Sequence, residues 1–478
     1  MKIFSVLVIF IAFYINSNNF IKASIQENFT INGCNVNLRT SFSQNSPLLV
    51  QDNKLYRPTN KAETLLFSQN EIVEIYCEEW INHFVINSKK TFRGSLNAIC
   101  ANGNNFLIHG MNITFPFQDL KCKHLPRFTR KPTTIKCYNE DDNAVLHEIG
   151  YQIDKNRFLS LYESCFNGQR TWYTKYNIDK FWNNFIHFKR PTIFENDVYN
   201  MSKNYYNTII QKEKLREIFS GSLPKEIQEL YENGGFFNRG HLAASSDFIF
   251  PSNKNLTFHL INVAPQWSKF NSGNCAKIET ATANYAAKMS KNLTTYTGTF
   301  GVINFKAYGV NKDFYLGNEI LPVPKLYYRI IMNDDIGVVL IGVNDPFPKN
   351  IKNISDYIIC QDISDDYKWD ASFDLWYTNR KSIGKGYSYA CELNEFLKIV
   401  KISDIEKISG ILGVTKKKYF NTYSVIIIIS VAAIFSLLAA IGFLIYIEKL
   451  SNHCLKKPWE LKATNNYDRF INDPKHKI

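Results

Sequence analysis

The sequence lacks the features of repetitive or unfolded chains. It contains no internal repeats and no low-complexity segments, and only 21% of its 478 residues are charged, whereas 45% are apolar. This composition is typical of a globular protein and excludes an intrinsically disordered chain. The length is sufficient for two domains with ample cores.

Acidic residues are in deficit. There are 43 Asp and Glu against 56 Lys and Arg, which gives a formal net charge of +13. A basic chain favours polyanions or anionic surfaces as partners. Composition alone does not distinguish between these partners.

The sequence also lacks any CxxC pair, which argues against a metal knuckle around Cys122, His124 and Cys137 and favours disulfides there. Ten cysteines are present, and setting aside Cys454 leaves nine. In an oxidising compartment nine cysteines form at most four disulfides with one thiol left over, although the spacing does not reveal the pairing. We interpret Cys454 as a reduced thiol, with palmitoylation as the alternative.

Two apolar runs predict how the chain enters and crosses a membrane. Residues 1–23 resemble a signal peptide, with an uncleaved anchor as the alternative. The run from Tyr423 to Ile447 has 25 residues and no charge, and at ~1.5 Å per residue it exceeds a hydrocarbon core of ~30 Å. We therefore expect a transmembrane helix over 423–447, after a basic tether at 414–422.

The signal peptide sets the expected orientation, because the lysines on either side of the helix nearly balance. We expect a single-pass type I protein of the secretory pathway, with an extracellular or luminal body and a cytosolic tail at 448–478. Six glycosylation sequons, all before this helix, agree with that orientation: Asn28, Asn112, Asn200, Asn255, Asn292 and Asn353.

Residues 24–145 contain five cysteines and short alternating runs separated by turn residues. This pattern predicts a small β-rich domain stapled by disulfides. It carries no motif that indicates chemistry.

Residues 146–413 are organised around the stretch from Asn238 to Glu279. We expect a strand that carries His241, and a second strand that alternates through Leu256, Phe258 and Leu260. A helix is expected from about Ser272, and its apolar positions recur at three- and four-residue steps at Cys275, Ile278, Thr282, Tyr285 and Met289. Two strands and a helix with a His and an Asn can build a one-metal hydrolytic site.

The rest of this region alternates between predicted strands and helices, which indicates a layered α+β domain. The segment 200–232 reads as largely helical, and 402–411 as a short amphipathic helix. Strands are expected at 159–162, 171–173, 295–304, 325–332 and 337–343.

The central stretch resembles the DNA/RNA non-specific endonucleases, also called ββα-metal or His-Me finger nucleases. Their signature is Asp-Arg-Gly-His, then Asn-x-x-Pro-Gln, then an Asn with a Glu eight residues later. Here Arg239 to His241, Asn262 to Gln266, and Asn271 with Glu279 occur in that order. The likeness extends from about Tyr151 to about Leu412 and is greatest to the secreted arthropod double-stranded ribonucleases.

The resemblance implies a general base and one bound metal ion. His241 is the implied base, and the alternative is a half-buried strand histidine. Asn271 is the implied ligand of Mg²⁺, with Mn²⁺ as a substitute, although an Asn at a helix start also serves as an N-cap. Glu279 is expected to hold metal-bound water, and the alternative is a solvated glutamate on the helix face.

The remaining implied roles concern phosphate binding and support. Arg239 and Arg190 are expected near the scissile phosphate. Asn262 and Gln266 are expected to brace the site, and Gly240 to keep the turn sterically open.

Two positions depart from the family pattern. Asn238 stands where the signature has Asp, which removes a carboxylate beside His241 and affects its orientation or pKa. Cys275 stands where many members have Trp, and we interpret it as a packing or disulfide residue.

The leading hypothesis is a Mg²⁺-dependent endonuclease, tethered to a membrane, that cuts DNA and RNA through contacts to phosphates. The competing hypothesis is a membrane-tethered nucleic-acid receptor that has lost turnover through Asn238. A purely structural adhesion ectodomain would leave the His-Asn-Glu spacing unexplained. A homodimer is kept open as a further association.

Overall fold

The structure is a computed structural model. It describes residues 33–58, 63–78, 82–86, 89–90, 94–111, 113–181, 189–191, 194–197, 202–317, 319–347, 351–416 and 422–454. The predicted signal peptide, the sequons at Asn28, Asn112 and Asn200, and residues 455–478 of the predicted tail lie outside these ranges. The chain divides into two compact units, residues 1–416 and 417–478.

The N-terminal region of the first unit consists of short strands, as its alternating pattern predicts. They are β1 (Gly33–Asn37), β2 (Leu48–Gln51), β3 (Lys54–Leu55), β4 (Thr64–Ser68), β5 (Ile72–Cys77), β6 (Phe84–Ile86), β7 (Lys89–Lys90), β8 (Gly94–Asn102), β9 (Asn105–Ile108), β10 (Thr114–Pro116) and β11 (Lys121–Cys122). Disulfides Cys34–Cys100 and Cys77–Cys122 cross-link them. These strands enclose a core of their own, which is rich in aromatic side chains.

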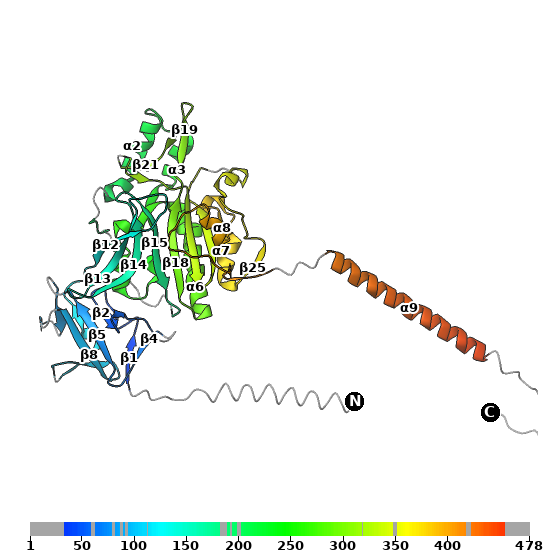
Figure 1. The fold of residues 1–478 in the computed structure, drawn as a ribbon, viewed down its shortest axis with the longest axis horizontal. Coiled ribbons are helices and arrows are strands. Elements are labelled where there is room, and N and C mark those ends of the chain that lie inside the picture. Colours follow the sequence, from blue (N-terminus) through cyan, green and yellow to red (C-terminus); the bar gives the residue numbers. More distant parts are fainter. Residues whose placement is uncertain are drawn as a thin grey trace, which may run out of the picture. The chain divides into compact units, whose positions relative to one another are not determined.

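A nine-stranded sheet forms the centre of the unit (Figure 1). Its strands are β12 (Thr129–Lys136), β13 (Val145–Gln152), β14 (Phe158–Phe166), β15 (Thr171–Ile178), β18 (Leu293–Phe300), β23 (Leu326–Asn333), β24 (Ile336–Val343), β26 (Ser388–Cys391) and β27 (Gly410–Ile411). Neighbours are antiparallel except for β27, which pairs parallel with β24. The predicted strands correspond to β14, β15, β18, β23 and β24, and the sheet also contains β12, β13, β26 and β27.

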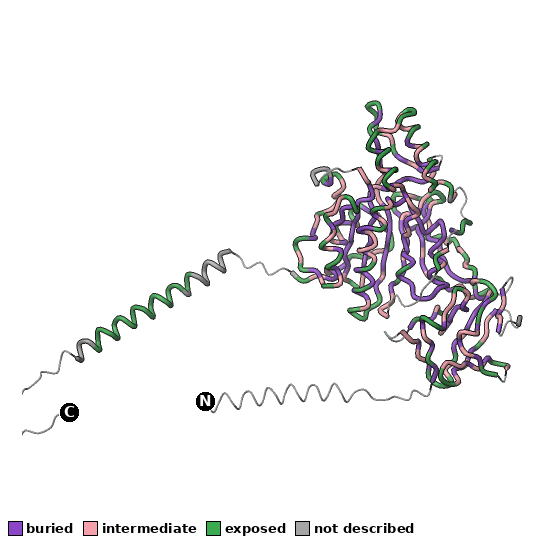
Figure 2. The backbone as a smooth tube through the Cα atoms, turned by 180° about the vertical axis from the view of Figure 1, so that it is seen from behind, coloured by how far each residue is buried: buried purple, intermediate pink, exposed green. Residues whose placement is uncertain are grey.

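The sheet is buried on both faces (Figure 2). In β24, Val338 and Leu340 point into one core, whereas Val339 and Ile341 point into the other. This alternation explains why the strand is apolar throughout. The first core also receives α6 (Ala276–Met289), and the second receives α8 (Leu393–Leu397). The fold is thus mixed α+β in layers, as predicted.

The remaining elements surround the sheet. They are α2 (Thr208–Ile218), α3 (Lys225–Glu232), β16 (Phe237–His241), α4 (Pro251–Leu256), β17 (Val263–Trp267), α5 (Ser268–Phe270), β19 (Asn304–Ala307), β20 (Val310–Asp313), β21 (Tyr315–Leu316), β22 (Leu321–Pro322), β25 (Tyr367–Trp369), α7 (Asp374–Asn379) and β28 (Val414–Lys416). Both α2 and α3 lie within the predicted helical segment 200–232.

The N-terminal strands are joined to the central sheet by direct contacts. Arg157 forms two hydrogen bonds with Glu74, at 2.8 and 2.9 Å, and the Tyr76 hydroxyl donates to the carbonyl of Gln152 at 2.8 Å. Phe250, from the segment before α4, lies in the N-terminal core. The predicted domain boundary at residue 145 falls at the first residue of β13, which forms a hairpin with β12.

The cysteine prediction is confirmed. The structure contains four disulfides, and the two outside the N-terminal strands are Cys137–Cys165 and Cys360–Cys391. Cys275 is the free thiol among the described residues of the first unit. Since Cys122 and Cys137 are both in disulfides, the metal-knuckle alternative is excluded.

The predicted second strand through Leu256, Phe258 and Leu260 is wrong. Residues Pro251–Leu256 form α4, a short 3-10 helix covers Leu260–Asn262, and β17 begins only at Val263. Proline at the first helical position favours a helix start, and the imidazole of His259 caps the 3-10 helix by accepting from the amide of Ile261. The apolar alternation reflects a buried turn.

Two helix predictions also need correction. Residues 402–411 are not helical, because Asn394 hydrogen-bonds both backbone groups of Ile408 and holds it extended. The helix expected from Ser272 is interrupted at Gly273, so that α6 begins at Ala276. At its far end Met289 is 44% exposed and does not belong to the buried face.

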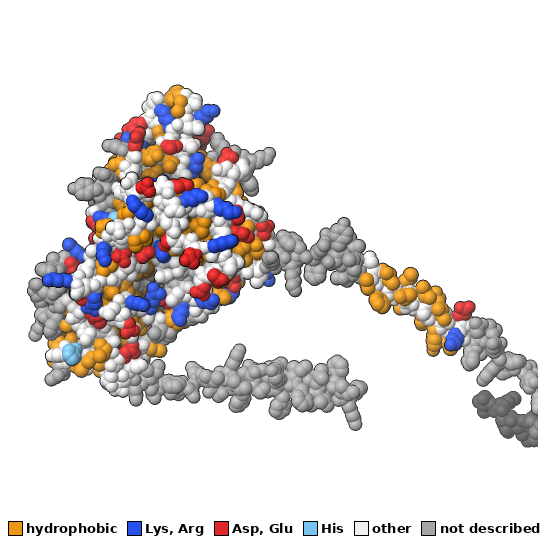
Figure 3. All heavy atoms as spheres, viewed as in Figure 1, with side chains coloured by type: hydrophobic (Ala, Val, Ile, Leu, Met, Phe, Trp, Pro, Cys, Tyr) orange, Lys and Arg blue, Asp and Glu red, His pale blue; other side chains and the backbone are white. Residues whose placement is uncertain are grey.

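The second unit contains α9 (Thr422–Cys454). The segment Ala433–Leu450 within it is long and apolar enough to cross a membrane. Its described apolar side chains are exposed, in contrast to the strands of the first unit (Figures 2 and 3). This agrees with the predicted membrane helix by length and composition.

Replacing Gly342 in β24 by Ala is expected to destabilise the protein. A Cβ at this position would lie 2.3 Å from the ring of Phe270, at the end of α5. Overpacking of this kind typically costs about 1–3 kcal/mol, so the midpoint of thermal unfolding should fall. Gly384→Ala is the control, since a Cβ there meets nothing within 4 Å. Equal midpoints for the two variants would contradict this packing.

Candidate active site

The strand that carries His241 is held tightly on both sides. β16 pairs antiparallel with β17, and His241 lies opposite Val263. A Cβ on Gly240 would lie 2.3 Å from the Cβ of Gln266, so only glycine leaves room for that buried side chain. From α2, Gln211 accepts from the amide of Phe237 at 3.0 Å and donates to its carbonyl at 2.8 Å. This role of Gln211 was not predicted from the sequence.

His241 lies against two aromatic rings. Its imidazole is 5.3 Å from the ring of Phe194 and 4.8 Å from that of Phe258. Burial, followed by the charges of Arg190 and Arg239, lowers the pKa of His241 to about 3. The Nε2 atom is buried and has no hydrogen-bond partner among the described residues. The imidazole is therefore neutral near neutral pH, and one of its nitrogens has no hydrogen bond to the described residues.

Two arginines flank the same aromatic pair. The guanidinium of Arg190 lies 5.6 Å from the ring centre of Phe258, and that of Arg239 lies 4.6 Å from the ring centre of Phe194. Contacts of this kind hold a guanidinium over an aromatic face. Both guanidinium groups therefore lie over the aromatic pair that contacts the histidine.

One cavity joins these groups to Asn271. It has a volume of about 290 Å³ and is lined by Arg190, Pro191, Phe194, Asn238, Arg239, His241, Phe258 and Asn271. Four of the residues selected from the sequence thus meet in one place. Glu279, Asn262 and Gln266 do not line this cavity and lie behind it.

Asn271 is positioned by a kink between α5 and α6. Gly273 has φ −97° and ψ −114°, and a Cβ there would lie 2.7 Å from the carbonyl of Lys385. The side chain of Asn274 donates to the carbonyl of Gly386 at 2.6 Å, which fixes the kink. Asn271 has helical backbone angles, and the N-cap position of α6 belongs to Cys275. The alternative role as N-cap therefore does not apply.

The cavity offers few ligands to a metal ion. Within the described ranges, no group of three or more His, Cys, Asp or Glu side chains is placed to hold one. The side-chain amide oxygens of Asn271 and Asn238 are the oxygen donors among its lining residues. A donor set this small fits Mg²⁺, which dehydrates reluctantly and keeps several waters.

Glu279 is connected to the site through a short chain of hydrogen bonds. Gln266 donates to Cys275 Sγ at 3.1 Å, and the thiol donates to the Glu279 carboxylate at 3.7 Å. Burial, with a further contribution from Asp247, raises the pKa of Glu279 to about 7. Burial also raises the pKa of Cys275, so its thiol stays protonated and can donate.

Asn262 braces the turn that follows His241. Its Oδ1 accepts from the amide of Ala243 at 2.8 Å, and its Nδ2 donates to the carbonyls of Ala243 and Thr257 at 2.9 and 3.0 Å. The side chain is completely buried. It therefore fixes the backbone on both sides of the turn.

A buried ion pair beneath the site was also missed. Arg329 in β23 pairs with Asp247, which accepts from the Tyr176 hydroxyl at 2.7 Å. Both charged side chains are almost completely buried. The available signal was a lone arginine within the otherwise apolar strand Leu326–Asn333.

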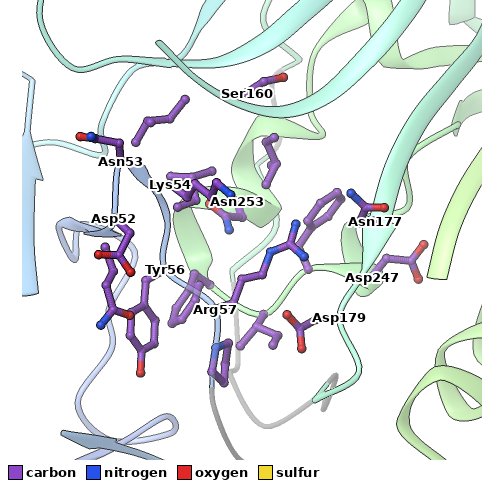
Figure 4. Close-up of a pocket in the computed structure, with 18 of the residues that line it drawn as sticks. Asp52, Asn53, Lys54, Tyr56, Arg57, Ser160, Asn177, Asp179, Asp247 and Asn253 are labelled. Carbon is purple, nitrogen blue, oxygen red and sulfur yellow. The ribbon is translucent and has the colours of Figure 1, made fainter. Parts of the chain in front are cut away.

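A larger cavity of about 720 Å³ lies elsewhere, where the β2–β3 turn meets β14 and the segment before α4 (Figure 4). Asp52, Lys54, Arg57 and Asp179 line it, but none of the site residues selected from the sequence does. Charged side chains of both signs are interspersed on the face shown in Figure 3, so net charge alone does not locate the site.

His241 should make the folded state sensitive to acid. Its pKa is about 3 when folded, against an ordinary value of 6.5, so only the unfolded chain binds this proton between these values. The stabilisation is present above pH 6.5 and is lost as the pH falls toward 3. Comparing thermal unfolding at pH 7 and pH 4.5, we expect a smaller loss for His241→Asn than for the wild type. The exposed His109→Asn is the control, and equal losses for all three proteins would contradict this environment.

Comparison with known proteins identifies the family to which this chain belongs. Residues 142–396 match the family model described as DNA/RNA non-specific endonuclease. A salivary endonuclease from Lutzomyia longipalpis is 27% identical over 274 residues, which cover 54% of this chain and 61% of that protein. The salivary protein Tsal2A from Glossina morsitans morsitans is 24% identical over 364 residues, covering 72% of this chain and 83% of that protein.

The chain thus spans less than two thirds of the salivary endonuclease. A solved structure titled as the EndoG/EndoGI complex is 18% identical, covers 39% of this chain and 72% of that chain, and has a TM-score of 0.27, too low to establish a shared fold. The family model alone covers more than half of the sequence. The chain belongs to the DNA/RNA non-specific endonuclease family.

Proposed function

We propose that the chain is a metal-dependent endonuclease that hydrolyses phosphodiester bonds in DNA and RNA, with double-stranded RNA among its candidate substrates. The observation that carries this proposal is the meeting of His241, Arg190, Arg239 and Asn271 in one cavity. Hydrolysis requires a base for water and positive charge around the phosphate, and this set provides both.

His241 is the proposed general base. Its neutral imidazole has an unpartnered Nε2 that can take a proton from water as the water attacks phosphorus. Arg190 and Arg239, which lie over the two aromatic rings that contact His241, neutralise the charge that builds on the phosphate oxygens. Contacts to phosphate carry no sequence information, so we expect little sequence preference.

We propose that Asn271 holds one Mg²⁺, or Mn²⁺ in its place. When bound, the ion would supply Lewis-acid stabilisation of the charge on the phosphate. Glu279 is the proposed acidic helper, and its position behind the cavity makes it a support for the hydration of the site. Asn262, Gln266 and Gly240 maintain the backbone around these groups.

The second candidate is a nucleic-acid receptor with impaired catalysis, because Asn238 replaces the aspartate of the family signature. Asn238 lines the cavity, so the missing carboxylate would have been part of the site. The unpartnered His241 Nε2 and the similarity to a salivary endonuclease favour the enzyme. Turnover distinguishes the two functions.

We also propose that the protein enters the secretory pathway and is anchored by α9, with residues 24–413 extracellular or luminal. Four disulfides support an oxidising compartment. The apolar segment Ala433–Leu450 supports the anchor. We further propose a domain boundary at residue 145 and association as a homodimer.

The purified full chain, in detergent, should cleave plasmid DNA and long double-stranded RNA when Mg²⁺ is present and lose activity in EDTA. His241→Ala should lower the cleavage rate by about 10²–10⁴-fold, the usual contribution of a general base. His109→Ala, at an exposed histidine, should retain the wild-type rate. Binding of both substrates without cleavage in any divalent metal would support the receptor and exclude the enzyme.

Asn238→Asp should shift the pH dependence of activity. A carboxylate in the cavity favours the imidazolium form, so it should raise the pKa of His241 from about 3 toward 6.5. The acid limb of the kcat/KM profile should therefore move to higher pH. Asn233→Asp, which adds the same charge at an exposed position, is the control. An unchanged acid limb would show that Asn238 does not tune His241.

A further inference from the structure

Arg190 lies on a segment with no regular secondary structure of its own. We refer to its described residues, 189–191 and 194–197, as the arginine segment. Arg190 is exposed, and its stacking on Phe258 places only the guanidinium. Another part of the segment must therefore fix the backbone that delivers this charge to the cavity.

The far end of the arginine segment is docked by its backbone. The amide of Glu195 donates to the carbonyl of Phe258 at 2.9 Å, and its carbonyl accepts from the amide of Leu260 at 3.0 Å. Phe194, next to it, packs against His241 and Phe258. Four residues of chain span at most ~14 Å, so docking at residue 194 limits where Arg190 can lie.

Asp197 is the side-chain anchor of this docking. One carboxylate oxygen lies 2.7 Å from Nε2 of His259, and the other lies 3.0 Å from Nε of Arg130. His259 is almost completely buried, and its Nδ1 accepts from the amide of Ile261 at 3.1 Å. Its Nε2 therefore carries the proton and lies close to the Asp197 carboxylate. Arg130 also donates to the carbonyl of Asp197 at 3.3 Å.

The near end of the segment is held more weakly. Gln44 from the N-terminal region donates to the carbonyl of Lys189 at 2.6 Å, and both residues are exposed. An exposed hydrogen bond contributes less to order than a charged one with a buried partner. The Asp197 contacts are therefore the stronger constraint on the arginine segment.

We propose that Asp197 is a positioning residue for the reaction, and that it acts by anchoring the arginine segment on His259 and Arg130 so that Arg190 stays in the His241 cavity. The inference rests on the proposed function. Asp197 does not line the cavity, so it contributes nothing directly to phosphate binding or proton transfer. Its whole effect on catalysis passes through Arg190.

A double-mutant cycle tests this dependence. Wild type, Asp197→Ala, Arg190→Ala and the double variant are compared by kcat and KM on long double-stranded RNA with Mg²⁺. We expect Asp197→Ala to lower kcat/KM by about tenfold when Arg190 is present, a coupling typical of residues that act together. In the Arg190→Ala background the same change should have less than about a twofold effect.

The conservative Asp197→Asn should restore part of the activity, since its amide oxygen keeps a polar atom next to Nε2 of His259. It also replaces the alanine variant in the cycle should that variant fail to fold. Glu63→Gln removes another exposed carboxylate that pairs with an arginine, and it should leave kcat/KM unchanged.

Equal losses from the Asp197 change in both backgrounds would overturn the inference, because they indicate a general structural effect. An unchanged kcat/KM in Asp197→Ala would also overturn it. A wild-type protein that cleaves nothing would instead refute the proposed function. The two failures are therefore distinguishable.

Discussion

The absence of a Cβ at residue 240 allows the Gln266 side chain to lie against β16, and the site depends on this close approach. The buried amide of Gln266 then reaches Cys275 at 3.1 Å, and the Cys275 thiol reaches Glu279. The glycine in β16 thus permits a chain of contacts from the strand that carries His241 to the first turn of α6. If residue 240 carried a Cβ, the strands β16 and β17 could not pack against α6 in its present position.

The electrostatic character of the cavity follows from this packing. His241 contacts two phenylalanine rings that also contact each other, and an arginine lies over each ring. The protonated imidazole is therefore disfavoured both by burial and by neighbouring charge. A negatively charged phosphate that enters the cavity would meet both guanidinium groups. The positive charge that disfavours protonation of His241 therefore also favours the binding of an anion in the cavity.

The sequence predicted what depends on short-range pattern. Apolar runs located five strands of the large sheet, and the cysteine count anticipated four disulfides with one thiol left over. The count did not identify that thiol as Cys275, which was interpreted as a packing or disulfide residue. Motif spacing selected His241 and Asn271, which line one cavity. The secondary-structure prediction was wrong at 256–262, where the imidazole of His259 caps a buried turn. It was also wrong at 402–411, where Asn394 forms hydrogen bonds with the backbone that a helix would use.

Long-range contacts account for what was missed. Asp197 and His259 are far apart in sequence, and no local pattern around either residue indicates their pairing. Gln211 and the Asp247–Arg329 pair were likewise invisible as local patterns. Such residues act by holding others in place, and only the folded chain brings them together.

The central claim is that His241 activates water rather than a hydroxyl of the substrate. The most direct measurement is cleavage of matched DNA and RNA duplexes in water enriched in oxygen-18, followed by mass spectrometry of the product ends. The account predicts one labelled oxygen on the terminal phosphate of both DNA and RNA products. Cleavage confined to RNA, with unlabelled 2′,3′-cyclic phosphate ends, would contradict it.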